Sequence, residues 1–293
     1  MEITVDLRSI NMVIQWFPGH MSKARRQVQE NLKYVDFVIE LVDARLPISS
    51  RNPMLGQIIG DKPRIIALNK ADLADSNAVA QWIEYFDEQG FVTLAINSKE
   101  EYTAKRLTVA AKKLMADKVA HDKERGIAHT TLRTMIIGIP NAGKSTLMNR
   151  LAGKKVAVTG NRPGVTKGQQ WIRTNKELEL LDTPGILWPK FEDQLVGLKL
   201  ALTGAIKDDL LPMDEVTIFG LNYFLKNYRT VTMKRYRMTE EDLELEIPDL
   251  IMELTARFGF RDDYDRFYNM FVKDVRDGKL GLFCLDEVRV DGL

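Results

Sequence analysis

Apolar residues along the chain form short continuous runs, and the segments between these runs are amphipathic. Runs that are apolar throughout are typical of parallel strands with both faces covered. Five such runs occupy residues 37–43, 64–70, 92–97, 132–140 and 178–182. Helical periodicity predicts helices between them, including 77–89 and the Lys- and Ala-rich segment 101–124. This alternation of strands and helices indicates an α/β fold with a doubly wound, mostly parallel sheet.

Beyond about Leu210 the apolar residues are spaced three or four apart, which predicts helices and no strand. We therefore expect an α/β domain over residues 1–206, followed by a small all-helical domain over residues 207–293. The length of 293 residues and the apolar fraction of 45% suit two cores of this size. Ligands of doubly wound sheets bind at the carboxyl ends of the strands, so we expect the chemistry there.

Composition and charge exclude several classes of protein. The one cysteine, Cys284, lies in an apolar run that is typical of a core, so no internal disulfide is expected. Acidic Glu2 and Asp6 do not suit a signal peptide, and no apolar run is long enough to span a membrane. Residues 207–293 have 13 basic and 19 acidic side chains, whereas residues 1–206 have 29 and 22. We expect a cytoplasmic protein without a membrane partner. The basic balance of residues 1–206 permits a polyanionic partner.

The fourth apolar run leads into a phosphate-binding loop. Residues 138–146 match the pattern G-x-x-x-x-G-K-[ST], between a predicted strand and a predicted helix. In such a loop the backbone N–H groups and the helix N-terminus point at phosphate oxygens. We expect Lys144 to contact the β- and γ-phosphates and the Ser145 hydroxyl to bind Mg²⁺. The nucleotide-binding residues expected here are Asn141, Ala142, Gly143, Lys144, Ser145 and Thr146.

The second and third runs end in side chains that suit a guanine base. A carboxylate at Asp72 can accept hydrogen bonds from both N1–H and the 2-amino group of guanine, whereas adenine has no such donor pair. Asn69 and the stem of Lys70 would brace the base and the phosphate loop. A backbone N–H in the next strand end would donate to guanine O6. The residues expected to bind the base are Asn69, Lys70, Ala71, Asp72, Asn97 and Ser98, with Lys99 beside them.

Two segments after the phosphate loop suit a magnesium ion and a γ-phosphate. Thr166 has the chemistry to complete the Mg²⁺ coordination when a γ-phosphate is present. Asp182, at the end of the fifth run, would hold Mg²⁺ through water, and the N–H of Gly185 would contact the γ-phosphate. Each segment alone is compatible with an ordinary turn. Together with the two loops described above, they predict a site for GTP and GDP.

The order of these motifs along the chain is unusual. Ordinary GTPases have the phosphate loop first and the N-K-x-D motif last, but here the N-K-A-D sequence comes first. We therefore predict a circularly permuted P-loop GTPase domain, which is tolerable because the termini of a domain tend to lie close together. The segment around Gly185 is then followed closely by the helical domain, so hydrolysis can be transmitted directly to it.

These residues and their order resemble the circularly permuted GTPases of the YlqF/RbgA type, which act in assembly of the large ribosomal subunit. The resemblance extends to residues 16–21, Trp-Phe-Pro-Gly-His-Met, and to residues 43–47, Asp-Ala-Arg-Leu-Pro, and it covers nearly the whole chain. It implies a GTPase that is required for a late step of 50S assembly and stimulated by the ribosomal particle. We expect a monomer whose partner is the large subunit, with its RNA and proteins.

The residue after D-x-x-G is Ile186, which has no hydrogen-bonding group, so we expect slow intrinsic hydrolysis. The resemblance implies that His20 orients the attacking water; alternatively, His20 caps a helix that starts near Ser22. Asn141 corresponds to the asparagine that binds K⁺ in potassium-stimulated GTPases, and it also suits a simple turn cap. The expected catalytic residues are His20, Lys144 and Thr166, and the expected metal ligands are Ser145, Thr166 and Asp182 for Mg²⁺ and Asn141 for K⁺.

A ribosomal partner would require basic and aromatic side chains together. One candidate group is Lys23, Arg25 and Arg26; the other is Tyr228, Arg229, Lys234, Arg235, Tyr236 and Arg237. The resemblance implies that the helical domain binds RNA. The excess of acidic side chains in residues 207–293 favours instead an ordinary solvated surface. Arg45 suits either an RNA contact or a contact with a neighbouring loop. A GTP-dependent RNA-modifying enzyme and a binding module without useful hydrolysis remain the competing hypotheses.

Overall fold

Two compact units make up the part of the chain that the structure describes. The structure is a computed structural model that describes residues 18–156, 171–174, 177–181 and 193–288, without the side chains of residues 18–24, 54 and 210. One unit comprises the described residues from 193 to 282 and is called the helical unit. The other, the α/β unit, comprises those from 18 to 181 and from 283 to 288. The boundaries therefore differ from those expected at residues 206 and 207.

The α/β unit contains one six-stranded sheet with the strand order β3-β2-β1-β4-β6-β5. The strands are β1 (Phe37–Asp43), β2 (Arg64–Asn69), β3 (Val92–Ala95), β4 (Leu132–Ile137), β5 (Trp171–Arg173) and β6 (Leu178–Leu181). Neighbouring strands are parallel, except that β5 is antiparallel to β6. The five predicted strands are thus confirmed, each beginning at the predicted residue, and β5 is an addition that the sequence analysis did not predict.

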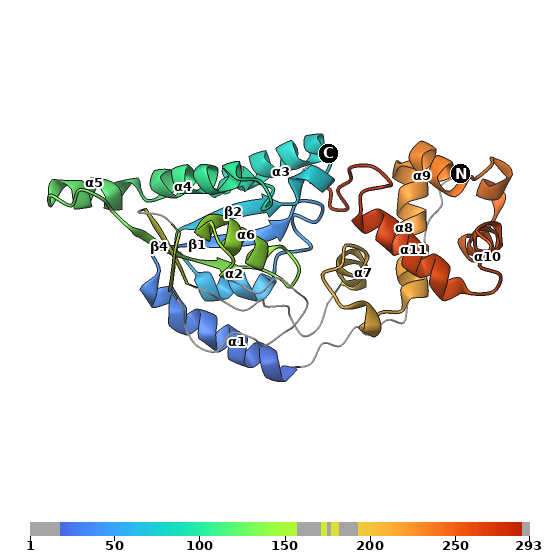
Figure 1. Cartoon of the computed structure of the whole chain (residues 1–293), viewed down its shortest axis with the longest axis horizontal. Helices are drawn as coiled ribbons and strands as arrows, with labels where there is room; N and C mark the ends of the chain where they lie inside the picture. Colours follow the sequence, from blue (N-terminus) through green and yellow to red (C-terminus); the bar gives the residue numbers. More distant parts are fainter. Residues whose placement is uncertain (1–17, 157–170, 175–176, 182–192, 289–293) are drawn as a thin grey trace. The chain divides into compact units, whose positions relative to one another are not determined.

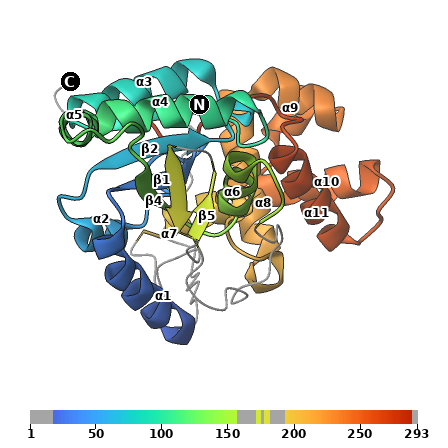
Figure 2. The same cartoon turned by 60° about the vertical axis from the view of Figure 1, so that its left-hand side comes forward.

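Helices cover both faces of this sheet, as a doubly wound fold requires (Figure 2). Its helices are α1 (Pro18–Asn31), η2 (Leu32–Tyr34), α2 (Pro53–Ile59), η3 (Ala71–Leu73), α3 (Ser76–Glu88), α4 (Tyr102–Leu114), α5 (Ala116–Glu124) and α6 (Lys144–Ala152). Val38 and Val42 share one face of β1; Val38 packs with α1 and α2, and Val42 packs with α3. Helices α4 and α6 contact each other and pack on β2, β3 and β4.

The segment predicted as one long helix over residues 101–124 is in fact two helices. Met115 leaves the helical conformation, with φ −105° and ψ 30°, and separates α4 from α5. Figure 1 shows α5 continuing past the end of the sheet. Helical periodicity persists on both sides of such a break, so the sequence pattern did not reveal it.

The helical unit is built around an aromatic core. It consists of α7 (Gln194–Leu202), η4 (Asp208–Leu210), α8 (Met213–Asn227), α9 (Arg229–Tyr236), η5 (Glu241–Glu244), α10 (Ile247–Arg257) and α11 (Tyr264–Arg276). Phe224, Tyr236, Phe267 and Phe271 are all completely buried. The ring of Tyr236 lies 5.9 Å from that of Phe271 and 6.0 Å from that of Phe267. Its described residues contain helices only, as predicted, and none of the described helices of either unit could cross a membrane.

The last described residues, 283–288, pack on the α/β unit; we call them the C-terminal strap. The Asp286 carboxylate accepts hydrogen bonds from the backbone N–H of Ile48 at 2.9 Å and of Ser49 at 2.7 Å. The Ser49 hydroxyl donates to the same carboxylate at 2.6 Å. Cys284 is buried in the apolar cluster under α3, which confirms it as a core residue but places it in the α/β unit.

The close packing of α8 against α11 predicts opposite effects for two helical glycines. A Cβ at Gly220 would lie 2.5 Å from the buried ring of Phe271, whereas a Cβ at Gly56 in α2 would meet nothing within 4 Å. We expect Gly220→Ala to destabilise the fold by about 1–3 kcal/mol, because overpacking outweighs the better helix propensity of alanine. Gly56→Ala should leave stability unchanged or raise it by up to about 1 kcal/mol. Urea unfolding measures both, and a Gly220→Ala variant as stable as Gly56→Ala would contradict the packing described.

Candidate nucleotide-binding site

The phosphate loop connects β4 to α6, as the sequence motif predicted. Two of its residues must be glycine because other groups approach their Cα atoms closely. A Cβ at Gly138 would lie 2.3 Å from the carbonyl oxygen of Leu41 in β1. A Cβ at Gly143, which has a φ of +103°, would lie 2.3 Å from Nδ2 of Asn69. The loop is thus held tightly against the ends of β1 and β2.

The side-chain amide of Asn69 joins three loops at the carboxyl edge of the sheet. Its Nδ2 donates to the carbonyl oxygen of Ala142 in the phosphate loop at 2.7 Å. Its Oδ1 accepts from the Ser98 backbone N–H at 3.0 Å and from the Ser98 hydroxyl at 2.6 Å. Asn69 is only 2% exposed. It therefore braces the phosphate loop and, at the same time, fixes the loop after β3.

A buried ion cluster of Asp43, Arg45 and Lys70 lies beside this amide. Asp43 accepts from Arg45 Nε at 2.9 Å and NH2 at 2.8 Å, and from Lys70 Nζ at 2.8 Å. Burial alone would raise the pKa of Asp43, but the two cations and their hydrogen bonds hold that pKa well below its usual range. Arg45 is 1% exposed and its guanidinium is bound by Asp43, so the structure favours a structural role for Arg45 over an RNA contact.

The ion cluster is connected to the residues expected to read the base, because Lys70 belongs to both. Lys70 has a left-handed backbone with φ 61°, and the chain then turns into η3, which contains Asp72. The N–H of Ala71 donates to the Ile96 carbonyl at 3.1 Å, which ties this loop to the end of β3. Asp72 is exposed, and its charge contributes to raising the pKa of Arg45, after the larger effects of burial and Asp43. Its carboxylate is thus accessible to a ligand and close to the cluster.

Lys144 begins α6 and points back into the phosphate loop. Its Nζ donates to the carbonyl oxygens of Gly138 at 3.0 Å and Ile139 at 2.5 Å. Burial, with a smaller contribution from the charge of Lys70, lowers the pKa of Lys144 to about 7. Asn141 has a left-handed backbone with φ 58°, which asparagine tolerates well in a turn. This conformation suits the turn and leaves the K⁺ hypothesis as a prediction.

Several expected site residues lie outside the described part of the chain. These are Thr166, Asp182 and Gly185, together with the neighbouring Ile186. His20 lies within the first turns of α1, but its side chain is outside the description. Because α1 begins at Pro18, His20 does not cap a helix that starts near Ser22.

The described residues suit a magnesium ion that is held largely by nucleotide phosphates. Ser145 lies in the first turn of α6 beside Lys144, where its hydroxyl can supply one ligand. Within the described ranges, no group of three or more His, Cys, Asp or Glu side chains could hold a metal. The Ser145 hydroxyl is thus the Mg²⁺ ligand that the described residues offer to a bound nucleotide.

The basic and aromatic residues of α9 are partly structural. Tyr236 is completely buried and its hydroxyl donates to Asp274 at 3.3 Å, so it is not available to stack on a base. Arg235 forms an ion pair with the same carboxylate at 2.6 Å. Lys234 and Arg237 are exposed, as are Arg25 and Arg26 in α1. The predicted aromatic contribution of Tyr236 is therefore wrong, because the tyrosine serves the core of the helical unit.

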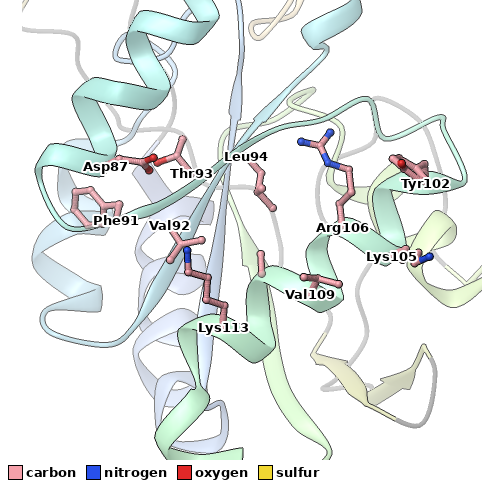
Figure 3. Close-up of a pocket in the computed structure, with 11 residues that line it drawn as sticks. Asp87, Phe91, Val92, Thr93, Leu94, Tyr102, Lys105, Arg106, Val109 and Lys113 are labelled. Carbon is pink, nitrogen blue, oxygen red and sulfur yellow. The ribbon is translucent and has the colours of Figure 1, made fainter.

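A cavity of about 590 Å³ lies elsewhere, along the outer edge of β3 (Figure 3). It is lined by Val92 and Leu94 of β3 and by residues of α4 that include Tyr102, Arg106 and Val109. Arg106 donates to the Ala95 carbonyl at 2.8 Å. None of the nucleotide motifs lines this cavity, so the candidate site rests on the loops at the carboxyl edge of the sheet.

Comparison with known proteins shows similarity to GTPases. A family model described as "50S ribosome-binding GTPase" matches residues 133–244. The chain is 51% identical to "Ribosome biogenesis GTPase A" of Bacillus cereus over 92% of each chain. It is 35% identical to mouse "Mitochondrial ribosome-associated GTPase 1" over 94% of this chain and 90% of the relative. A crystal structure of GNP-bound YlqF from T. maritima shares the fold, with a TM-score of 0.62 at 24% identity over 90% of this chain and 98% of that one.

The tight contact between Gly143 and Asn69 predicts that the phosphate loop does not accept a side chain. In Gly143→Ala the new methyl group would displace the Asn69 amide, and a backbone with φ +103° would be strained. We expect the affinity for GDP to fall about tenfold or more, as a strain of 1–3 kcal/mol implies. Fluorescent GDP titration measures the affinity, with Gly56→Ala as the control. Unchanged affinity in Gly143→Ala would contradict the role given to the Asn69 amide.

The lowered pKa of Lys144 predicts that nucleotide binding takes up a proton. With a pKa of about 7, most Lys144 side chains are neutral at pH 8 before binding. Phosphate oxygens favour the charged ammonium, so the pKa rises in the complex and affinity should fall as pH increases from 7 to 9. Calorimetry of GDP binding at pH 8, in two buffers of different ionisation enthalpy, measures the uptake. A binding enthalpy that is independent of the buffer would contradict the prediction.

Proposed function

Since the chain belongs to the ribosome biogenesis GTPase A family, we propose that its hydrolysis of GTP serves a late step in the assembly of the large (50S) ribosomal subunit. The observation that supports this most directly is the 51% identity over 92% of a relative named for ribosome biogenesis. The description of the family model, a 50S ribosome-binding GTPase, supports the large subunit as the partner. We propose that the chain acts as a monomer in the cytoplasm, where the subunit is assembled.

In this function the site binds the two ends of GTP through different elements. The backbone N–H groups of the phosphate loop and Lys144 bind the β- and γ-phosphates. Asp72 accepts from N1–H and the 2-amino group of guanine, and the residues from Asn97 to Lys99 lie at the neighbouring strand end. The hydrogen bond between Asn69 and Ala142 supports this arrangement, because it joins the loop that contains Asp72 to the phosphate loop at the carboxyl edge of the sheet.

Metal ions complete the charge balance at the phosphates. We assign Mg²⁺ to the Ser145 hydroxyl, Thr166 and Asp182, together with phosphate oxygens, where it neutralises charge that develops on the β- and γ-phosphates. Asn141 would bind K⁺ beside the loop and add a second positive charge. The exposure of Asn141 within the phosphate loop supports this assignment, because an ion beside the loop can reach it.

Hydrolysis transfers the γ-phosphoryl group to water and yields GDP and inorganic phosphate. Because Ile186 has no group that can orient the water, we propose that His20 does so once the ribosomal particle has bound. Imidazole can accept a hydrogen bond from the water and position its oxygen for in-line attack. Exposed basic side chains such as Arg25 in α1, Lys234 in α9 and Arg237 directly after α9 are available for contact with ribosomal RNA.

This proposal predicts that large ribosomal subunits stimulate GTP hydrolysis. We expect the turnover of the purified chain in potassium buffer to rise about tenfold or more when 50S subunits are added, because partner-supplied positioning accounts for at least this factor in other GTPases. Release of inorganic phosphate, with and without subunits, measures the effect. Purified small subunits are the control. Tight GTP binding without stimulation would indicate a nucleotide-dependent binding module and would contradict the proposed stimulation of hydrolysis by the large subunit.

A pair of histidine variants distinguishes water positioning from binding in the same assay. His20→Ala should reduce stimulated turnover by about 10²-fold or more while leaving GDP affinity unchanged. His121→Ala, in the exposed face of α5, should leave both unchanged. Full stimulation in His20→Ala would show that another group positions the water.

A further inference from the structure

The C-terminal strap contacts the loop after β1 and the segment after β2 that follows Asp72. The Leu285 N–H donates to the Arg45 carbonyl at 2.9 Å, and Asp286 binds the turn at Ile48 and Ser49. On the other side, Phe283 pairs with the segment that follows Asp72. Its N–H donates to the Leu73 carbonyl at 3.5 Å, and its carbonyl accepts from the Asp75 N–H at 3.4 Å. The strap thus adds a second connection between two segments that also meet through the Ala44 N–H, which donates to the Asn69 carbonyl at 2.7 Å, and through the buried ion cluster.

The strap also covers the Arg45 side of this ion cluster. The Phe283 ring is completely buried, and the Arg45 guanidinium lies over it, with 5.6 Å between the guanidinium carbon and the ring centroid. Asp43 is 3% exposed and Arg45 is 1% exposed. Charged pairs hold their geometry more firmly when water is excluded, because water screens the attraction and competes for each hydrogen bond. Removing the cover would therefore loosen the bonds from Asp43 to Arg45 and Lys70.

We propose that the C-terminal strap is a positioning element for guanine recognition: by covering the Arg45 side of the Asp43–Arg45–Lys70 cluster, it holds Lys70 and Asp72 in the conformation that selects guanine. This inference rests on the proposed role of Asp72 in reading the base. Lys70 is the link, since its Nζ is bound by Asp43 while its left-handed backbone directs the chain to Asp72. The strap acts through these residues and does not touch the nucleotide itself.

Contacts with the phosphates do not depend on the strap in the same way. Asn69 holds the phosphate loop through Ala142, and Lys144 bonds to carbonyls within that loop. Loosening Lys70 and Asp72 would therefore weaken contacts to the base edge more than contacts to the phosphates. The result is a change in base selectivity, which a general loss of stability does not produce.

Comparison of GDP with IDP measures this selectivity. IDP lacks the 2-amino group, so the ratio of the two affinities reports the hydrogen bond that Asp72 accepts from it. We expect Asp286→Asn and Phe283→Leu to lower the GDP/IDP affinity ratio about fivefold or more, which is the lower end of coupling between linked sites. Asp286→Asn removes the charge of the carboxylate and leaves one acceptor oxygen for the N–H groups of Ile48 and Ser49, so the charge-assisted hydrogen bonds that hold the strap there are weakened. Phe283→Leu keeps an apolar cover and removes only the ring from Arg45.

Two further variants separate the possible outcomes. Asp242→Asn is the matched control, because Asp242 also accepts from a backbone N–H, that of Thr239 at 2.6 Å, and from Arg257 at 2.7 and 2.8 Å, but it lies in the helical unit. It should leave the GDP/IDP ratio unchanged. Asp72→Asn should lower the ratio if Asp72 reads the base.

The inference is supported if both strap variants and Asp72→Asn lower the ratio while Asp242→Asn does not. A ratio that falls in Asp72→Asn but not in the strap variants would overturn the role of the strap and leave the base-reading assignment intact. An unchanged ratio in Asp72→Asn would overturn that assignment and the inference with it. An equal fall of the ratio in Asp286→Asn and Asp242→Asn would show that the change does not depend on the strap and would overturn its role. Thermal unfolding of each variant at the assay temperature establishes that the measured protein is folded.

Discussion

The amide of Asn69 is the contact on which the arrangement of the site depends. One asparagine offers a carbonyl oxygen and an amino group, and here both are used: the amino group holds Ala142 and the oxygen holds Ser98. An aspartate in this place would have no donor for the Ala142 carbonyl, and a leucine would leave both loops without a partner. The parallel sheet makes the contact available, because it aligns the ends of β1 and β2, with Asp43 opposite Asn69. The phosphate loop can approach because glycine occupies position 143.

This contact also explains why the circular permutation preserves a working site. The residues that meet at the carboxyl edge are brought together by strand order in space, and the sheet order places β1 between β2 and β4. The chain builds β1, β2 and β3 first and then returns to the other side of β1 with β4. Asn69 and Ala142 are far apart in sequence, yet the hydrogen bond between them needs only that β2 and β4 end at the same edge. The order of the motifs in the chain is therefore free to change, provided that the sheet is the same.

The sequence pattern predicted the elements that depend on nearby residues, namely the strands and the phosphate loop. The strands were predictable because each is apolar along its whole length, and the phosphate loop was predictable because its backbone requires particular residues at fixed spacing. The break at Met115 was not predictable, since helical periodicity continues on both sides of it.

Tyr236 looked like an exposed partner for RNA in the sequence, and only the packing of α9 against α11 shows that it belongs to the core. The C-terminal strap was assigned to the helical domain because nothing in its own sequence indicates that Asp286 binds Ser49. Thr166, Asp182 and Gly185 stay predictions from the motif alone.

The buried ion cluster shows how the same charges serve structure and site together. A buried carboxylate is costly unless several donors satisfy it, and Asp43 receives three from side chains and one from the Arg45 N–H. Replacing such a cluster with apolar residues often costs no stability, so its value lies in the geometry that it fixes. Here that geometry includes the charge balance of the phosphate loop. Burial and, to a smaller extent, the charge of Lys70 lower the pKa of Lys144, and Asp43 offsets part of the Lys70 charge. Under the proposed function, Lys144 is the cation for the phosphates, and Lys70, held by Asp43, serves the base.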